Sequence, residues 1–365
     1  MEERVYWLGF SSFHGIGPTK FNMLLEMFWT AENAWNATET ELLHSGIGDK
    51  TAQKFLDFRK QFHLESYAEQ LAKAHVSYLI QDEKAYPQLL KQIINSPYVL
   101  YTKGNASLLH QDKDERLLAI VGTRKVTDYG RHITETLAND LSIAGCVIVS
   151  GLAMGVDAIA HAATLRAKGK TIAILGCGVD CCTPKENENL YEQIIAGGGL
   201  IVSEAPLSQQ SFKGSFPSRN RIIAGLSLGV LVTEGAEDSG SLITAKEALK
   251  SNRLVFAVPG PITSSVSRGP IALIQDGAKM VTEAKDILDA IGLQNIQVKL
   301  RKEKIQTDNK EEQTILDILE NEQMQFDELV KRTGIASSQL GTILSLMEMK
   351  GWILGTDNGA FIIAL

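Results

Sequence analysis

Arginine and glycine residues gather in turns that follow short apolar segments, where they could bind an anion. Gly122-Thr123-Arg124 follows one such segment, and Arg219 and Arg221 lie in the loop 216–221 after another. A guanidinium group forks onto two phosphate oxygens. Glycine allows the backbone to approach a phosphate, and helix N-termini offer free N–H donors. Tight turns need glycine in any case, so it is the repetition together with arginine that predicts an anionic ligand.

Further turns along the chain have a similar composition. They are Ser150–Asp157, Gly176-Cys177-Gly178, Ser239-Gly240-Ser241 and Pro259-Gly260. Known phosphate motifs are missing: the first turn is not G-x-G-x-x-G, and no G-x-x-x-x-G-K-[ST] occurs. We interpret His161 as a helix-packing histidine and Asp157 as a residue of a first helical turn.

Six apolar runs alternate with helical segments and must position these turns. The runs are Leu117–Val121, Cys146–Ser150, Thr171–Leu175, Leu200–Ser203, Gly229–Thr233 and Leu254–Val258; the helices include Tyr129–Ala144, Val156–Lys168 and Ser241–Lys250. This alternation predicts an α/β fold with a Rossmann-like, doubly wound, mainly parallel sheet. Right-handed crossovers place the carboxyl ends of the strands at one edge, where such sheets bind ligands.

The segments before and after this alternating region have different sequence patterns. Residues 1–75 have helical periodicity and two glycine hairpins, Gly15-Ile16-Gly17 and Gly46-Ile47-Gly48, and resemble a helix-hairpin-helix or SAM-like domain. Such hairpins contact nucleic-acid backbones; the alternative is a plain helix-packing unit. Residues 76–292 form the extended Rossmann-like domain, which begins with the candidate strands Val76–Ile80 and Tyr98–Tyr101.

The C-terminal segment has the pattern of a winged helix. A polar linker, 293–311, precedes a module, 312–365, with three predicted helices and a hairpin; these are Gln313–Leu319, Phe326–Arg332, Ser337–Lys350, Trp352–Gly355 and Ala360–Ala364, with a turn at 357–359. The helix 337–350 has few cations, whereas DNA readers expose Arg and Lys. We therefore favour a protein-contact or regulatory role for this module over DNA reading.

Composition limits the class of protein without excluding nucleic acid. The chain has 365 residues and a formal net charge of −7, which argues against a uniformly basic surface but not against a local basic groove. The four cysteines lack zinc-site spacing, so we expect reduced thiols, no metal and no cofactor. The chain shows neither a signal-like start nor an apolar run of spanning length, so we expect a cytoplasmic protein.

Six motifs together resemble the DNA-processing protein A family (DprA, also called Smf). They are "AIVGTRKVTDYG" from Ala119, "VSGLAMGVDAIAHAATL" from Val149, "GKTIAILGCGVD" from Gly169, "FPSRNRIIAGLS" from Phe216, "SGSLITAKEAL" from Ser239 and "VFAVPG" from Val255. The resemblance covers residues 76 to about 290. It departs at Cys182-Thr183-Pro184, where the family usually has an aromatic residue before the proline.

The resemblance implies a function and a set of contacts. Family members bind single-stranded DNA, dimerise, and load the recombinase RecA during natural transformation and homologous recombination, and the family is not known for catalysis. The implied basic lining is Arg124, Lys170, Arg219, Arg221 and Lys246. The implied backbone and hydroxyl donors are Ser150, Gly151, Ser239 and Gly240, and Gly122 is a further implied DNA contact. Phe216 and Asn220 would wall a pocket for one base. For Lys170 and Lys246, the alternative is a solvated charge beside a helix.

Two further expectations concern assembly and catalysis. The apolar cluster Ile271, Leu273, Ile274 and Met280 falls where the resemblance places a homodimer face; the alternative is that these residues pack beneath the last strand. The architecture also resembles nucleotide phosphoribohydrolases, with Glu204 and Glu234 as a candidate carboxylate pair. The stretch 234–240 lacks the glycine-rich loop of those enzymes, so we favour a binding protein over an enzyme.

Overall fold

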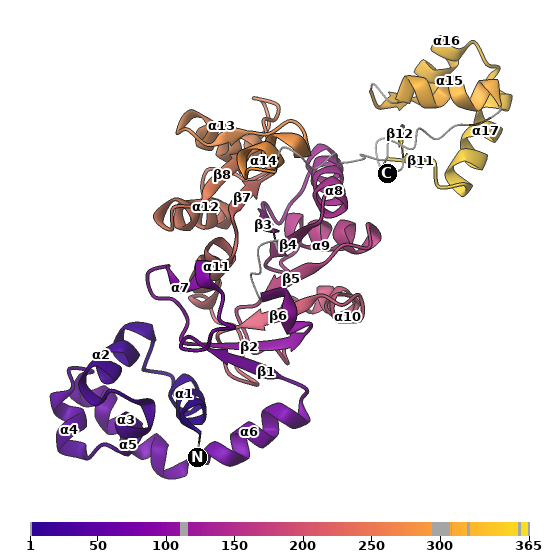
Figure 1. The fold of residues 1–365 in the computed structure, drawn as a ribbon. Coiled ribbons are helices and arrows are strands. Elements are labelled where there is room, and N and C mark those ends of the chain that lie inside the picture. Colours follow the sequence, from indigo (N-terminus) through magenta and orange to yellow (C-terminus); the bar gives the residue numbers. More distant parts are fainter. Residues whose placement is uncertain are drawn as a thin grey trace. The chain divides into compact units, whose positions relative to one another are not determined.

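The computed structural model describes residues 2–109, 116–293, 307, 309–319, 322–356 and 359–363. The chain divides into two compact units, 1–296 and 297–365 (Figure 1). Among the described residues, no helix is both long and apolar enough to cross a membrane.

The first unit is built on a sheet of nine described strands, in the order β1-β2-β6-β5-β4-β3-β7-β8-β9. The strands are β1 (Ser77–Ile80), β2 (Val99–Gly104), β3 (Arg116–Val121), β4 (Cys146–Ser150), β5 (Thr171–Ile174), β6 (Leu200–Ser203), β7 (Gly229–Val232), β8 (Leu254–Ala257) and β9 (Lys279–Met280). Strands β3 to β9 pair in parallel, whereas β2 is antiparallel to both β1 and β6. The predicted α/β sheet is confirmed, and its strand order reverses at the β3–β7 boundary.

Helices cover both faces of the sheet (Figure 1). One face carries α8 (Asp128–Ile143), α9 (Val156–Arg166), α10 (Glu188–Ala196) and α14 (Ala284–Ala290); the other carries α7 (Gln88–Lys91), α11 (Ser215–Leu226), α12 (Gly240–Lys250) and α13 (Arg268–Gln275). Because strand side chains alternate between faces, the β3 residues Leu117 and Ala119 belong to the core beneath α11 and α12.

The N-terminal helices share a core with the sheet edge. They are α1 (Glu3–Ser11), α2 (Pro18–Phe28), α3 (Ala31–Asn36), α4 (Glu39–His44), α5 (Asp49–Gln61) and α6 (Leu64–Lys73). The Phe21 ring of α2 stacks on Tyr98 with centroids 4.1 Å apart, and the hydroxyls of Ser11 and Tyr101 lie 2.6 Å apart. One apolar cluster runs from these helices to Ile201 of β6. The finer boundary at residue 75 stays a prediction.

The two glycine hairpins differ in conformation. Gly46 and Gly48 have φ of +82° and +88°, so only the second hairpin uses the left-handed region that favours glycine. Gly17 has φ of −80° and is the N-cap of α2, which begins with Pro18. At Pro18 the missing N–H removes no intrahelical hydrogen bond.

The expected dimer residues lie near β9, at one edge of the sheet. Leu273 of α13 is buried and packs in the core against β8, so the prediction that it faces a partner needs correction. Ile274 is partly buried against the same core, and Ile271 is half-buried. Met280, on the edge strand, is 51% exposed and remains available for a partner. The homodimer itself stays a prediction.

The second unit has the winged-helix arrangement of three helices and a small sheet. Its elements are α15 (Lys310–Leu319), β10 (Met324–Gln325), α16 (Phe326–Thr333), α17 (Ser337–Met349), β11 (Ile353–Gly355) and β12 (Ala360–Ile363). The strand β10, absent from our prediction, pairs with β12 and completes a sheet in the order β10-β12-β11. The hairpin residues 357 and 358, and most of the predicted linker 293–311, lie outside the described residues.

A buried histidine ties α9 to the sheet. His161 is fully buried, and its Nδ1 lies 2.6 Å from the hydroxyl of Thr171. Thr171 donates its only hydroxyl proton to the carbonyl of Ile148 at 2.6 Å, so the imidazole must donate from Nδ1. Burial, with the nearby Arg219 charge, lowers the pKa of His161 to about 3. The prediction of a helix-packing histidine is confirmed.

This histidine should make the first unit sensitive to acid. Its pKa in the folded state is depressed, so the stabilisation is complete above the unfolded pKa of about 6.5 and declines as pH falls toward 3. Between pH 6.5 and pH 5 the loss should be about 2 kcal/mol. In urea unfolding monitored over this range, the stability difference between wild type and His161→Asn should shrink by that amount. An unchanged difference would mean that the imidazole has the same pKa in the folded and the unfolded chain.

Candidate nucleic-acid interface

Helix α11 starts at the carboxyl edge of the parallel strands and continues over one face of the sheet. It joins β6 to β7, which are separated in the sheet by β5, β4 and β3. We predicted a loop at 216–221, but these residues form the first turns of α11. Pro217 fits there because a proline in the first turn interrupts no intrahelical hydrogen bond. The sequence FPSRNR is therefore a helix start held over the strand ends.

Arg124 and Phe216 meet where the turn after β3 faces α11. The Arg124 guanidinium carbon lies 5.5 Å from the centre of the Phe216 ring, within the range of a cation–π contact. Arg124 is exposed, and no hydrogen bond or ion pair engages its guanidinium within the part of the chain that the structure describes. Its N–H donors are therefore available to an anion, beside an aromatic face.

We predicted that Arg219 is part of an exposed basic lining, but the structure buries it. Its side chain is only 6% exposed, and its Nη1 donates to the carbonyl of Ile174, at the end of β5, over 2.7 Å. A Cβ on Gly151 would come within 1.7 Å of Nη1, so glycine is required there by the arginine. The expected exposed phosphate ligand is a buried support that fixes α11 to the sheet.

Asp157 completes this support. Its carboxylate accepts hydrogen bonds from the backbone N–H of Gly151 at 3.0 Å and of Ala153 at 3.4 Å. Burial raises the pKa of Asp157, while the Arg219 charge and these hydrogen bonds oppose the rise. The Gly151 N–H, predicted to bind the ligand, is therefore already used inside the protein.

Two other residues predicted to contact the ligand also have internal roles. Ser150 is fully buried, and its hydroxyl donates to the carbonyl of Ile120 at 2.6 Å. A Cβ on Gly122 would lie 2.5 Å from Val156 and 2.7 Å from the Glu234 carbonyl, so this glycine serves close packing of the turn. The Ser150 hydroxyl is therefore used inside the protein, whereas the contact of Gly122 with a ligand stays a prediction.

The start of α12 lies beside α11 and retains exposed backbone. Ser239 is the N-cap and accepts from the Ser241 N–H at 3.3 Å. Gly240 is exposed, with open space where a Cβ would stand. Asn220 donates to the Gly240 carbonyl at 3.3 Å, so its amide links the two helices. Ser239, Gly240 and Asn220 therefore lie where α11 and α12 begin. Phe216 and Arg124 meet at the same end of α11.

The predicted lysines lie elsewhere. Lys170 directly precedes β5, at the amino end of the strand, and its Nζ donates to the Gly197 carbonyl at 2.8 Å. The amino ends of parallel strands form the edge opposite the arginines, so the structure does not bring Lys170 together with Arg124 and Phe216. Lys246 is exposed in the second turn of α12, with no contact that links it to Arg124 or Phe216 among the described residues.

The candidate carboxylate pair of the enzyme alternative is not assembled. Glu204 follows β6 and pairs with Arg221, whereas Glu234 follows β7, four strand positions away. At about 4.8 Å per strand the two are about 19 Å apart, beyond the separations at which two carboxylates flank one bond. Glu234 is buried and accepts from the N–H and hydroxyl of Thr127, the N-cap of α8. Its role is therefore structural.

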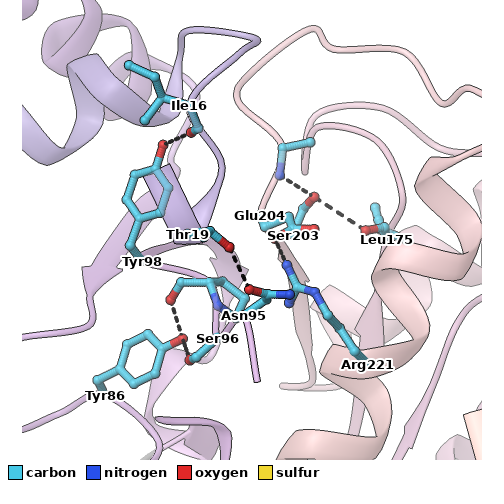
Figure 2. Close-up of polar contacts among 12 residues, drawn as sticks. Ile16, Thr19, Tyr86, Asn95, Ser96, Tyr98, Leu175, Ser203, Glu204 and Arg221 are labelled. Carbon is cyan, nitrogen blue, oxygen red and sulfur yellow. Dashed lines mark hydrogen bonds and ion pairs between the residues drawn. The ribbon is translucent and has the colours of Figure 1, made fainter. Parts of the chain in front are cut away.

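One part of the site was missed by the sequence analysis. Tyr98 of the region before β2 donates its hydroxyl to the Ile16 carbonyl at 2.8 Å, which brings the first glycine hairpin to the carboxyl edge near Glu204 and Arg221 (Figure 2). Spacing along the chain gives no signal for this contact, because 82 residues separate the two partners.

Comparison with known proteins agrees with this architecture. The family model of DNA recombination-mediator protein A matches residues 77–292, and that of the DprA winged helix domain matches residues 301–358. Protein Smf of Synechocystis is 40% identical over 293 residues, which are 80% of this chain and 73% of that protein.

Two solved structures are similar over most of their own length. DNA processing protein A from Streptococcus pneumoniae superposes with a TM-score of 0.65 and 35% identity, over 79% of this chain and 96% of that one. A structure on the single-stranded DNA binding mode of DNA processing protein A from Helicobacter pylori gives 0.53 and 33%, over 59% and 95%. On this evidence, the chain belongs to the DNA recombination-mediator protein A (DprA/Smf) family.

Proposed function

We propose that this chain binds single-stranded DNA along the carboxyl edge of its sheet and passes it to a RecA-type recombinase, without itself catalysing a reaction. The observation that supports this best is the exposed Arg124 guanidinium beside the Phe216 ring. The arginine offers donors to a phosphate, and the ring offers a stacking surface to a base. The solved structure of the Helicobacter pylori relative, described for its single-stranded DNA binding mode, supports the same ligand.

A preference for single strands follows from the chemistry of this pair. Aromatic side chains stack on base faces, which are exposed in single strands and covered by neighbouring bases in a duplex. Stacking accepts any base, so sequence preference should be weak. The family's description as a recombination mediator supports a recombinase as the partner, and a homodimer through the β9 edge stays part of the proposal.

Replacing Arg124 with alanine should weaken binding of oligo-dT while leaving the fold intact. A hydrogen bond from a charged group contributes about 1.5–3 kcal/mol, which corresponds to roughly a 10- to 150-fold loss of affinity. The slope of log affinity against log salt should fall by about 0.7 for the lost phosphate contact. Fluorescence anisotropy at several salt concentrations would measure both.

Lys170→Ala is the matched control, because it removes a cation from the opposite edge of the sheet. Its affinity and salt slope should equal those of wild type. If Arg124→Ala binds as tightly as wild type, or if Lys170→Ala is the weaker variant, the assignment of the strand to the carboxyl edge is wrong.

Removal of the winged-helix unit should preserve most single-strand binding. The sequence of α17, Ser337–Met349, contains no lysine or arginine, and the amino group of the following Lys350 bonds to Glu312 at 2.7 Å. A chain ending at residue 304 should bind oligo-dT within about tenfold of wild type.

A second truncation, ending at residue 296, isolates the linker charges. It also removes Lys299, Arg301, Lys302 and Lys304, which lie outside the described residues, so any extra loss measures their contribution. A loss well above tenfold for the longer chain would place part of the DNA site in the winged-helix unit.

A further inference from the structure

A cavity of about 660 Å³ lies between the first glycine hairpin and the carboxyl ends of β5 and β6. Its walls are the loop 13–20, the strand ends 175–176 and 203–206, and the α11 side chains Arg219 and Arg221. We call it the hairpin cavity. Its volume falls within the range of pockets that hold small organic ligands.

Hydrogen bonds between residues that line the hairpin cavity hold its walls in place (Figure 2). Tyr98 donates to the Ile16 carbonyl at 2.8 Å, and Thr19 donates to the Asn95 side chain at 2.9 Å. At the strand end, the Ser203 hydroxyl accepts from the Ala205 N–H at 3.0 Å. The cavity is therefore formed before any ligand arrives.

The charge within the cavity is positive, and some of its donors are unused. Its lining includes the cations Lys20, Arg219 and Arg221 against one carboxylate, Glu204. Asp157 behind the lining offsets the charge of Arg219, so the excess positive charge comes from Lys20 and Arg221. Glu204 pairs with Nη2 of Arg221 (Figure 2), but the buried Nη1 of Arg221 and the Nε of the 6% exposed Arg219 have no hydrogen-bond partner among the described residues. Buried guanidinium donors of this kind favour an anionic acceptor.

An aromatic surface stands at the same cavity. Phe212 lines it and is 50% exposed, and the His14 ring meets Phe212 edge-on with centroids 5.8 Å apart. A planar base can stack on an exposed phenylalanine ring. The hairpin cavity therefore combines anion donors with a stacking surface, as the site of Arg124 and Phe216 does, but with different residues.

We propose that the hairpin cavity binds one nucleoside monophosphate unit, with its phosphate at Arg221 and its base against Phe212. The unit is either a nucleotide of the bound single strand or a free nucleotide. The first source rests on the proposed function, because α11 contributes both to the cavity and to the contact between Arg124 and Phe216. The N-terminal helices are then part of the ligand site as well as of the fold.

Calorimetric titration of the full chain with dTMP tests the proposal. Wild type should bind dTMP saturably, and Glu204→Gln/Arg221→Gln, which removes the ion pair without leaving an unpaired charge, should lose about tenfold or more in affinity. Phe212→Ala, at an exposed ring, should weaken dTMP by about tenfold and leave the binding of inorganic phosphate unchanged. Lys170→Gln, on the opposite edge, should bind dTMP like wild type.

The two sources separate when oligo-dT is added to the dTMP complex. Release of dTMP identifies the site as part of the strand path, and simultaneous binding identifies a free-nucleotide site. Absence of saturable dTMP binding by wild type, or undiminished binding by both variants, would overturn the proposal. If dTMP fails to bind while oligo-dT binds, only this inference fails; if dTMP binds and oligo-dT does not, the proposed function fails and the cavity stands.

Discussion

The buried side chain of Arg219 attaches α11 to the carboxyl edge of the sheet. The guanidinium of Arg219 lies beneath the backbone of Gly151, donates to the end of β5 and is close enough to the Asp157 carboxylate to oppose the rise in its pKa. Leaving a buried donor or acceptor without its partner costs about 1–3 kcal/mol, and more where the group is charged. This anchor ties α11 to the end of β5, and α11 carries Phe216 and Arg221 of the two proposed sites.

Helix α11 contributes to two candidate sites, each of which combines an arginine with an aromatic ring. Toward the switch point of the strand order, it places Phe216 beside the exposed Arg124. Toward β6, it places Arg221 at the hairpin cavity, which the N-terminal helices close through the hydroxyl of Tyr98. Gly122 and the Ser150 hydroxyl serve to pack these turns, so the two proposed sites rest on side chains more than on a phosphate-binding loop.

The sequence predicted the sheet well because continuous apolar runs that alternate with helical segments have few other folded solutions. The residues of the site were harder to predict. Burial of Arg219 depends on the β5 carbonyl and on Asp157, which are distant in sequence and meet only in three dimensions. Lys170 directly precedes β5, and a position before a parallel strand already indicates the edge opposite Arg124. The contact between Ile16 and Tyr98 has no sequence signature at all.

Hydrogen exchange of the full chain with and without oligo-dT tests the central claim, that the carboxyl edge under α11 is where the strand lies. Protection should increase in residues 122–127, in the α11 start at 212–221 and at the start of α12, and should stay constant around Lys170 at the amino edge. Protection confined to residues 168–172, or to the winged-helix residues 309–356, would contradict this account and place the strand on another surface.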